Sequence, residues 1–127
     1  PLAGYLILAQ RLFENGVPYA SSWNFGPDDR SNQPVQWIVE RLIEIWGSGS
    51  WQLCSEPKPH ETQLLRVDSS KAKQQLNWQC QWSLEQSLQH IVSWQKAYLA
   101  GSDMRQPCFQ EIQVYQQTFL RNTGVVG

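Results

Sequence analysis

The sequence predicts an α/β fold in which helices predominate over a few short strands. Most of the chain consists of segments whose apolar residues recur every three or four positions, which is typical of amphipathic helices. Three short runs between them, residues 23–27, 51–54 and 63–67, read as strands bounded by turn residues. Three short strands do not make a self-sufficient sheet, so we expect a small parallel or mixed sheet packed against the helices.

The first two predicted helices have clear ends. Residues 1–15 carry apolar side chains at helical spacing, and Gly16 supplies a left-handed stop. The second helix opens at Pro34 and ends at Gly47. It has the cleanest amphipathic stripe in the chain, formed by Val35, Ile38, Val39, Leu42, Ile43 and Trp46.

Three more helices are predicted in the second half of the chain. Asp68 and Ser69 cap a short helix over residues 70–76 that ends at Asn77. Ser83 and Gln86 have capping-box spacing, and the helix that they open stops at Gly101. Residues 108–120 form the last helix. We expect one domain over residues 1–121, followed by a flexible tail over 122–127.

Composition excludes several classes of function. The formal net charge is -1, from 10 basic and 11 acidic residues that are scattered, so neither nucleic acid nor an anionic membrane is an expected partner. No apolar stretch approaches the ~20 residues of a membrane span, and no signal peptide is evident, so a cytoplasmic protein is expected. The three cysteines form no C-x-x-C pair, which argues against a disulfide framework or a zinc site.

Catalytic motifs are also missing. Gly47 and Gly49 follow a helix and lack the third glycine of a dinucleotide fingerprint, and none of the four tyrosines has a lysine four residues later. His60 and His90 are far apart, and His90 lies off the apolar face of its helix, as expected of a solvated surface residue. We therefore expect no catalytic residue and no metal site in this chain.

The loop over residues 56–61 concentrates one lysine, one histidine and two glutamates around two prolines. Pre-ordered polar loops are common places for ligand contacts. Lys58 could meet a phosphate there, and His60 could bond a base or a phosphate oxygen. An exposed, well-solvated turn explains the same composition, and composition leaves both interpretations open.

Several stretches, in order along the whole chain, resemble the CDP-glucose 4,6-dehydratases. They read W-N-F-G-P-D at 23–28, P-H-E at 59–61, D-S-S-K-A at 68–72, L-N-W at 76–78, W-S-L-E at 82–85 and G-S-D-M at 101–104. The D-x-S-K-A and L-x-W segments are similar to those of many extended short-chain dehydrogenase/reductases that act on nucleotide sugars, and the others narrow the likeness to the CDP-glucose branch. Asn77 stands where that family usually has glycine, and asparagine tolerates the left-handed conformation required there.

The resemblance implies a two-part parent enzyme. Its Rossmann domain would hold NAD and the catalytic Tyr-x-x-x-Lys pair, and this chain would be the helix-rich C-terminal subdomain that binds the nucleotide sugar. The parent would be an NAD-dependent lyase that converts CDP-glucose to CDP-4-keto-6-deoxyglucose, a precursor of dideoxysugars in bacterial surface polysaccharide. Because this chain lacks the NAD loop and the Tyr/Lys pair, the resemblance implies an inactive fragment with no cofactor of its own.

The resemblance also suggests binding residues. Lys58 falls where related dehydratases have an arginine that grips the diphosphate, and lysine keeps the charge without the bidentate fork. Asp28 and Asp29 become candidates for ribose or base contacts. His60 and Glu61, in the branch-specific P-H-E, would read the cytosine or its neighbours. By contrast, Asp68 and Lys71 are expected to brace the following helix.

The expected ligand is CDP-glucose or CDP, bound weakly or not at all without the Rossmann domain. That domain would cover apolar surface in the parent. In the chain alone, Leu6, Phe13, Trp23 or Trp37 would be exposed, so we expect self-association. Two alternatives remain: a non-catalytic interaction or oligomerisation module derived from a nucleotide-sugar dehydratase or epimerase, and an independent enzyme with a scattered site.

Overall fold

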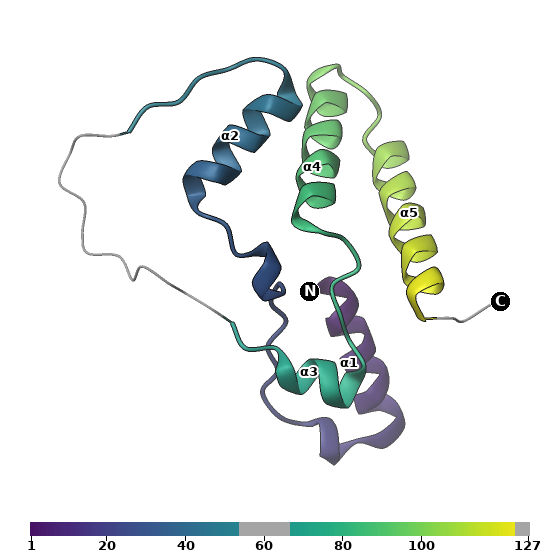
Figure 1. Ribbon diagram of the computed structural model, residues 1–127. Helices are drawn as coiled ribbons and strands as arrows, with labels where there is room; N and C mark the ends of the chain where they lie inside the picture. The colour runs from purple at the N-terminus through teal and green to yellow at the C-terminus, as the bar shows by residue number, and fades with distance from the viewer. Residues whose placement is uncertain (54–66, 124–127) are drawn as a thin grey trace. The chain divides into compact units, whose positions relative to one another are not determined.

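The computed structural model describes residues 1–53 and 67–123 (Figure 1), and these residues fall into two units. The first unit contains residues 1–32 and 67–80, and the second contains residues 33–53 and 81–123. In the first lie α1 (Leu2–Asn15), the short 3-10 helices η1 (Val17–Tyr19) and η2 (Asp29–Ser31), and α3 (Ser70–Leu76). The second holds α2 (Val35–Trp46), α4 (Leu84–Leu99) and α5 (Arg105–Thr123). None of the described helices is long and apolar enough to cross a membrane.

The first four α-helices begin and end within two residues of the predicted positions, because their ends carry specific chemical signals. Gly16 and Gly47 follow α1 and α2 with φ of 67° and 94°, and Asn77 ends α3 in the left-handed region with φ of 52°. The capping box of α4 is formed: Ser83 Oγ accepts from the Gln86 amide at 3.2 Å, and Gln86 Oε1 accepts from the Ser83 amide at 2.9 Å. The helix-rich character of the fold is thereby confirmed. The last helix is longer than expected at both ends: we predicted residues 108–120, and α5 covers Arg105–Thr123.

The predicted strands are wrong wherever the structure describes them. Residues 23–27 and 51–53 are not in strands, and no strand occurs within residues 1–53 and 67–123. The third predicted strand lies mostly outside the described residues. In the first of these segments, side chains take the place of a strand partner: the Gly26 carbonyl accepts hydrogen bonds from Ser69 Oγ at 3.3 Å and from Cys80 Sγ at 3.7 Å. The residue pattern of this segment is therefore compatible with an extended chain, but it does not show that the chain pairs with another strand.

The core of the first unit forms where α3 and the residues after it meet α1 and the 23–27 segment. Its buried members are Ala72, Leu76 and Trp78, and the half-buried residues packed around them are Ile7, Leu8, Tyr19, Trp23, Phe25 and Cys80. The Phe25 ring lies edge-on to both Tyr5 and Trp78, with centroid distances of 5.2 Å in each case. Gly4 makes this possible, since a Cβ there would lie 2.3 Å from the Phe25 ring. The segment 23–27 thus anchors the unit through two aromatic side chains, Trp23 and Phe25.

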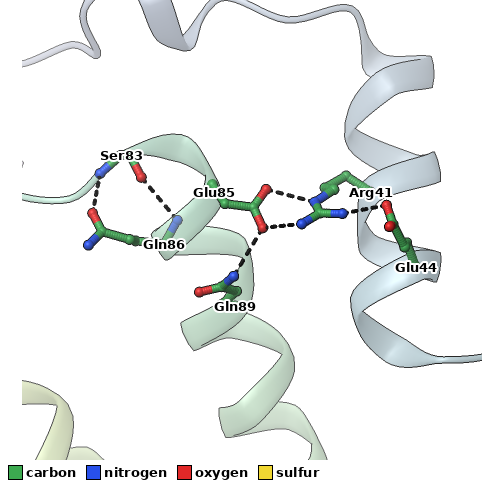
Figure 2. A network of polar contacts seen from close by, with 6 residues as sticks. All are labelled: Arg41, Glu44, Ser83, Glu85, Gln86 and Gln89. Carbon is green, nitrogen blue, oxygen red and sulfur yellow. Dashed lines mark hydrogen bonds and ion pairs between the residues drawn. The ribbon is translucent and has the colours of Figure 1, made fainter.

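In the second unit, α2 and α5 each pack against α4. Leu88 and Val92 of α4 are buried. A polar network also joins α2 to α4 (Figure 2): Arg41 binds Glu85 in bidentate fashion, Nε to Oε2 at 2.7 Å and Nη2 to Oε1 at 2.6 Å. Glu44 pairs with the same guanidinium, and Gln89 donates to Glu85 Oε1 at 3.0 Å. The network orients the start of α4 relative to α2.

The Arg41–Glu85 pair is expected to make the second unit sensitive to acid. Hydrogen bonds from Arg41 lower the pKa of Glu85 in the folded chain. A group whose folded pKa is depressed contributes stability above its unfolded pKa, about 4.3 for glutamate, and that contribution is lost as the pH falls through the folded pKa. The Arg41→Gln variant should therefore be less stable than the parent chain near neutral pH, and the gap should narrow at acid pH.

Urea unfolding at a series of pH values measures this difference. Arg11→Gln is the matched control, because the Arg11–Glu14 contact of 3.5 Å joins two exposed side chains of α1. A constant gap between the parent chain and Arg41→Gln at all pH values would contradict the assignment.

Candidate functional site

The chain segment around Gly26 positions the two aspartates that follow it. Gly26 lies against Val67, and a Cβ at Gly26 would be 2.9 Å from the Val67 Cβ and 3.0 Å from its carbonyl oxygen. Glycine is therefore required for this approach. Together with the hydrogen bond from Ser69 to the Gly26 carbonyl, the contact holds Pro27 and the aspartates over the residues that precede and open α3.

A polar hollow of about 290 Å³ lies at this place in the first unit. It is lined by Pro27, Asp29, Val67, Asp68, Ser69, Ser70 and Lys73. Asp28 lies at its edge and forms an ion pair with Lys73. The structure thus brings two predicted site residues, Asp28 and Asp29, to one hollow with four polar residues that we had not assigned to a ligand.

The hollow carries more negative than positive charge. The hydrogen bond to Asp28 raises the pKa of Lys73, which therefore stays protonated. Hydrogen bonds from Ser70 lower the pKa of Asp68, and its Oδ1 accepts from the Ser70 amide at 2.9 Å. Three carboxylates and one ammonium group offer mostly hydrogen-bond acceptors. Such a site suits ligand hydroxyl and amino groups better than phosphate oxygens.

Of the other predicted binding residues, Lys58, His60 and Glu61 lie outside the described residues, and their roles stay predictions. Val67, which lines the hollow, is the first described residue after that segment. Lys73 was missed in the sequence because its partner, Asp28, is 45 positions away.

The predicted bracing roles of Asp68 and Lys71 are confirmed. Asp68 accepts a hydrogen bond from the Ser70 amide in the first turn of α3, as described above. Lys71 Nζ donates to Ser21 Oγ at 2.7 Å and to the Ser22 carbonyl at 3.0 Å, and it lies 4.2 Å from the centroid of the Trp23 ring. Lys71 therefore ties α3 to the segment after η1, and Trp23 is covered rather than exposed.

His90 is not the solvated surface residue that we expected. Its side chain is half-buried, its Nδ1 lies 2.9 Å from Glu111 Oε1, and its ring stacks on Trp82 with 4.1 Å between centroids. Tyr115 packs edge-on against the same Trp82. His90 thus joins α4 to α5. Within residues 1–53 and 67–123, no group of three or more histidine, cysteine, aspartate or glutamate side chains is arranged to hold a metal ion.

Comparison with known proteins identifies the kind of protein that this chain resembles. No family model matches the chain. A curated nucleotide-sugar dehydratase does match, with 41% identity over 122 residues. That relative is CDP-glucose 4,6-dehydratase from Salmonella typhimurium, and the matched stretch covers 95% of this chain. It covers 34% of the relative, so the chain spans about a third of the length of that protein. The resemblance drawn from the sequence motifs is confirmed.

Proposed function

We propose that this chain is the C-terminal, nucleotide-sugar-binding part of a CDP-glucose 4,6-dehydratase. The observation that carries the proposal is the 41% identity that extends over 95% of the chain. The full-length enzyme would oxidise CDP-glucose at C4 with NAD, eliminate water across C5 and C6, and return the hydride to C6. Its product would be CDP-4-keto-6-deoxyglucose, made in the cytoplasm for surface polysaccharide.

Within this proposal, the polar hollow receives the nucleoside end of the substrate. Asp29 lines the hollow and Asp28 flanks it, so their carboxylates can accept hydrogen bonds from ribose hydroxyls or from the cytosine amino group. The diphosphate requires positive charge. Because Lys73 is already paired with Asp28, we assign the diphosphate to Lys58, and the cytosine contacts to His60 and Glu61.

Turnover is assigned to the full-length enzyme and not to this chain. A hydride transfer needs the cofactor and a proton shuttle in one pocket. The sequence contains neither a dinucleotide fingerprint nor a Tyr-x-x-x-Lys pair, and Gly47 serves to end α2 in the left-handed conformation. NAD therefore belongs to the parent enzyme in this proposal, and the chain alone is inactive. No specific observation favours the alternative of a purely structural interaction module.

Calorimetric titration with CDP tests the assignment of Asp29. A hydrogen bond to a charged group contributes roughly 1.5–3 kcal/mol, so Asp29→Asn should weaken CDP binding by about tenfold to a hundredfold. Glu40→Gln is the matched control, because Glu40 is an exposed carboxylate on α2 that accepts from Gln36 at 2.9 Å. Equal affinities of Asp29→Asn and the parent chain, both shown to be folded by circular dichroism, would exclude this carboxylate from the site.

A further inference from the structure

Helix α4 contacts its two neighbours, α2 and α5, through different kinds of side chain. Toward α2 it presents apolar residues: Ile91 and Val92 line an apolar hollow together with Leu42, Ile43 and Trp46 of α2. Val92 is buried there. The packing of α2 on α4 therefore rests on the removal of apolar surface from water.

Helix α5 is attached with little apolar burial. Among residues 105–122, whose side chains the structure describes, none is buried. The large apolar side chains of this helix remain open to solvent: Phe109 is 51% exposed, Ile112 52% and Leu120 45%. Because burial of apolar surface is the main driving force for packing, this force holds α5 only weakly.

The contacts between α4 and the middle of α5 gather around one indole ring. His90 stacks on Trp82, and Tyr115 of α5 packs edge-on against the same ring. Glu111 of α5 lies against His90 Nδ1 with both carboxylate oxygens, at 2.9 Å for Oε1 and 2.8 Å for Oε2. These four residues, Trp82, His90, Glu111 and Tyr115, are called the Trp82 cluster. The Trp82 cluster joins the two helices through partly solvated groups.

Two further hydrogen bonds hold the ends of α5. Near its start, Trp94 Nε1 donates to Cys108 Sγ at 3.4 Å, and near its end Asn122 Nδ2 donates to Gln81 Oε1 at 2.8 Å. When α5 moves away from α4, water can take the place of either partner. Such bonds therefore contribute a small net free energy to the docked state.

The connection between the two helices separates them mechanically. Gly101 has a φ of 74°, which glycine adopts without strain, and its amide donates to the Tyr98 carbonyl at 3.0 Å. The Ser102 amide donates to the Ala97 carbonyl at 3.1 Å. The end of α4 is thus closed by its own hydrogen bonds before α5 begins, so α4 can remain intact while the direction of α5 changes.

Once detached, α5 is a poor helix. Its sequence contains β-branched and aromatic residues, which have lower helix propensity than alanine or leucine. Helices in proteins owe most of their stability to packing, and isolated ones are marginal in water. Loss of the contact with α4 and loss of the helical hydrogen bonds of α5 should therefore occur together.

We propose that α5 is a hinged arm that detaches from α4 as one cooperative unit while α2 and α4 stay packed. The Trp82 cluster sets the equilibrium between the docked and the detached state. Detachment uncovers the side of α4 that carries His90 and Trp94, which lies opposite the side that packs against α2.

Native-state hydrogen exchange of the whole chain, resolved by residue, tests this proposal. In the parent chain, amides of residues 110–118 should exchange at least tenfold faster than those of residues 88–92 in α4. Glu111→Gln should accelerate exchange in α5 about threefold to tenfold and leave α4 unchanged. Glu40→Gln is the matched control, because it removes an exposed carboxylate of α2 and should alter neither helix. Equal protection of α4 and α5, or equal acceleration of both by Glu111→Gln, would overturn the proposal.

A variant on the facing helix separates the effect of the contact from any change in the intrinsic stability of α5. His90→Asn alters α4 and should accelerate exchange in α5 at least as much as Glu111→Gln does. The double variant should exchange at nearly the rate of His90→Asn alone, because both changes break the same contact. If His90→Asn left α5 unaffected, or if the two effects were fully additive, the Trp82 cluster would not hold α5.

Discussion

Replacement of Trp78 by alanine should lower the free energy of unfolding of the first unit by about 3–5 kcal/mol. Trp78 is 3% exposed, and its ring packs edge-on against Phe25 in the small core around α3. Its indole Nε1 has no hydrogen-bond partner in the described part of the chain. The loss is therefore one of packing, and it is large because the core contains few other buried side chains.

Native-state hydrogen exchange of the α3 amides measures this loss. Trp51→Ala is the control, because it removes the same side chain from a position that is 37% exposed. The Trp51→Ala change should lower the free energy of unfolding much less than Trp78→Ala. If α3 amides were protected to the same degree in Trp78→Ala as in the parent chain, the core assigned to the first unit would be wrong.

The second large effect is expected from Leu88→Ala, which should lower the stability of the second unit by about 2–5 kcal/mol. Leu88 is 4% exposed and lies on α4, the helix against which both α2 and α5 pack. The substitution leaves a cavity that these neighbours can fill only in part.

Leu99→Ala provides a control within the same helix, since Leu99 is 65% exposed. This change should alter stability by no more than about 0.5 kcal/mol. Hydrogen exchange of the α4 amides compares the two variants directly. Similar losses in both would mean that α4 does not bury the face that carries Leu88 and Val92.

The helices could be predicted from the sequence because their ends are defined by local chemistry. Gly47 and Asn77 adopt the left-handed conformation after a helix, Gly16 ends α1 with a positive φ of 67°, and Ser83 with Gln86 closes a capping box. Each signal acts within a few residues, so no tertiary information is needed to read it.

The strand over residues 23–27 was mispredicted because a strand needs a partner, and residue types do not reveal one. Trp23 and Phe25 have high β-propensity, but that propensity reflects a fit to any half-buried, extended environment. Here the environment is supplied by Gly4, which lets the Phe25 ring approach α1, and by hydrogen bonds from Ser69 and Cys80 to Gly26.

Part of the candidate site could also be predicted. Asp28 and Asp29 were singled out through a family motif, and the structure places both at the polar hollow. The pairings of Asp28 with Lys73 and of Arg41 with Glu85 could not be found, because each joins residues more than 40 positions apart. His90 was misjudged for a similar reason, since its partner Glu111 belongs to another helix.

The central claim is that this chain recognises the nucleotide of CDP-glucose, and calorimetric titration of the parent chain with CDP, with UDP as the comparison, tests it most directly. We expect saturable binding that favours CDP and that weakens in the Lys58→Ala variant, because loss of the cation removes the diphosphate contact. The cytosine amino group is a donor that uracil lacks, so the Glu61 carboxylate, to which we assign a cytosine contact, should discriminate between CDP and UDP. Equal affinities for CDP and UDP would contradict the proposed function, and no heat with either nucleotide from folded protein would mean that the nucleotide site also needs the Rossmann domain.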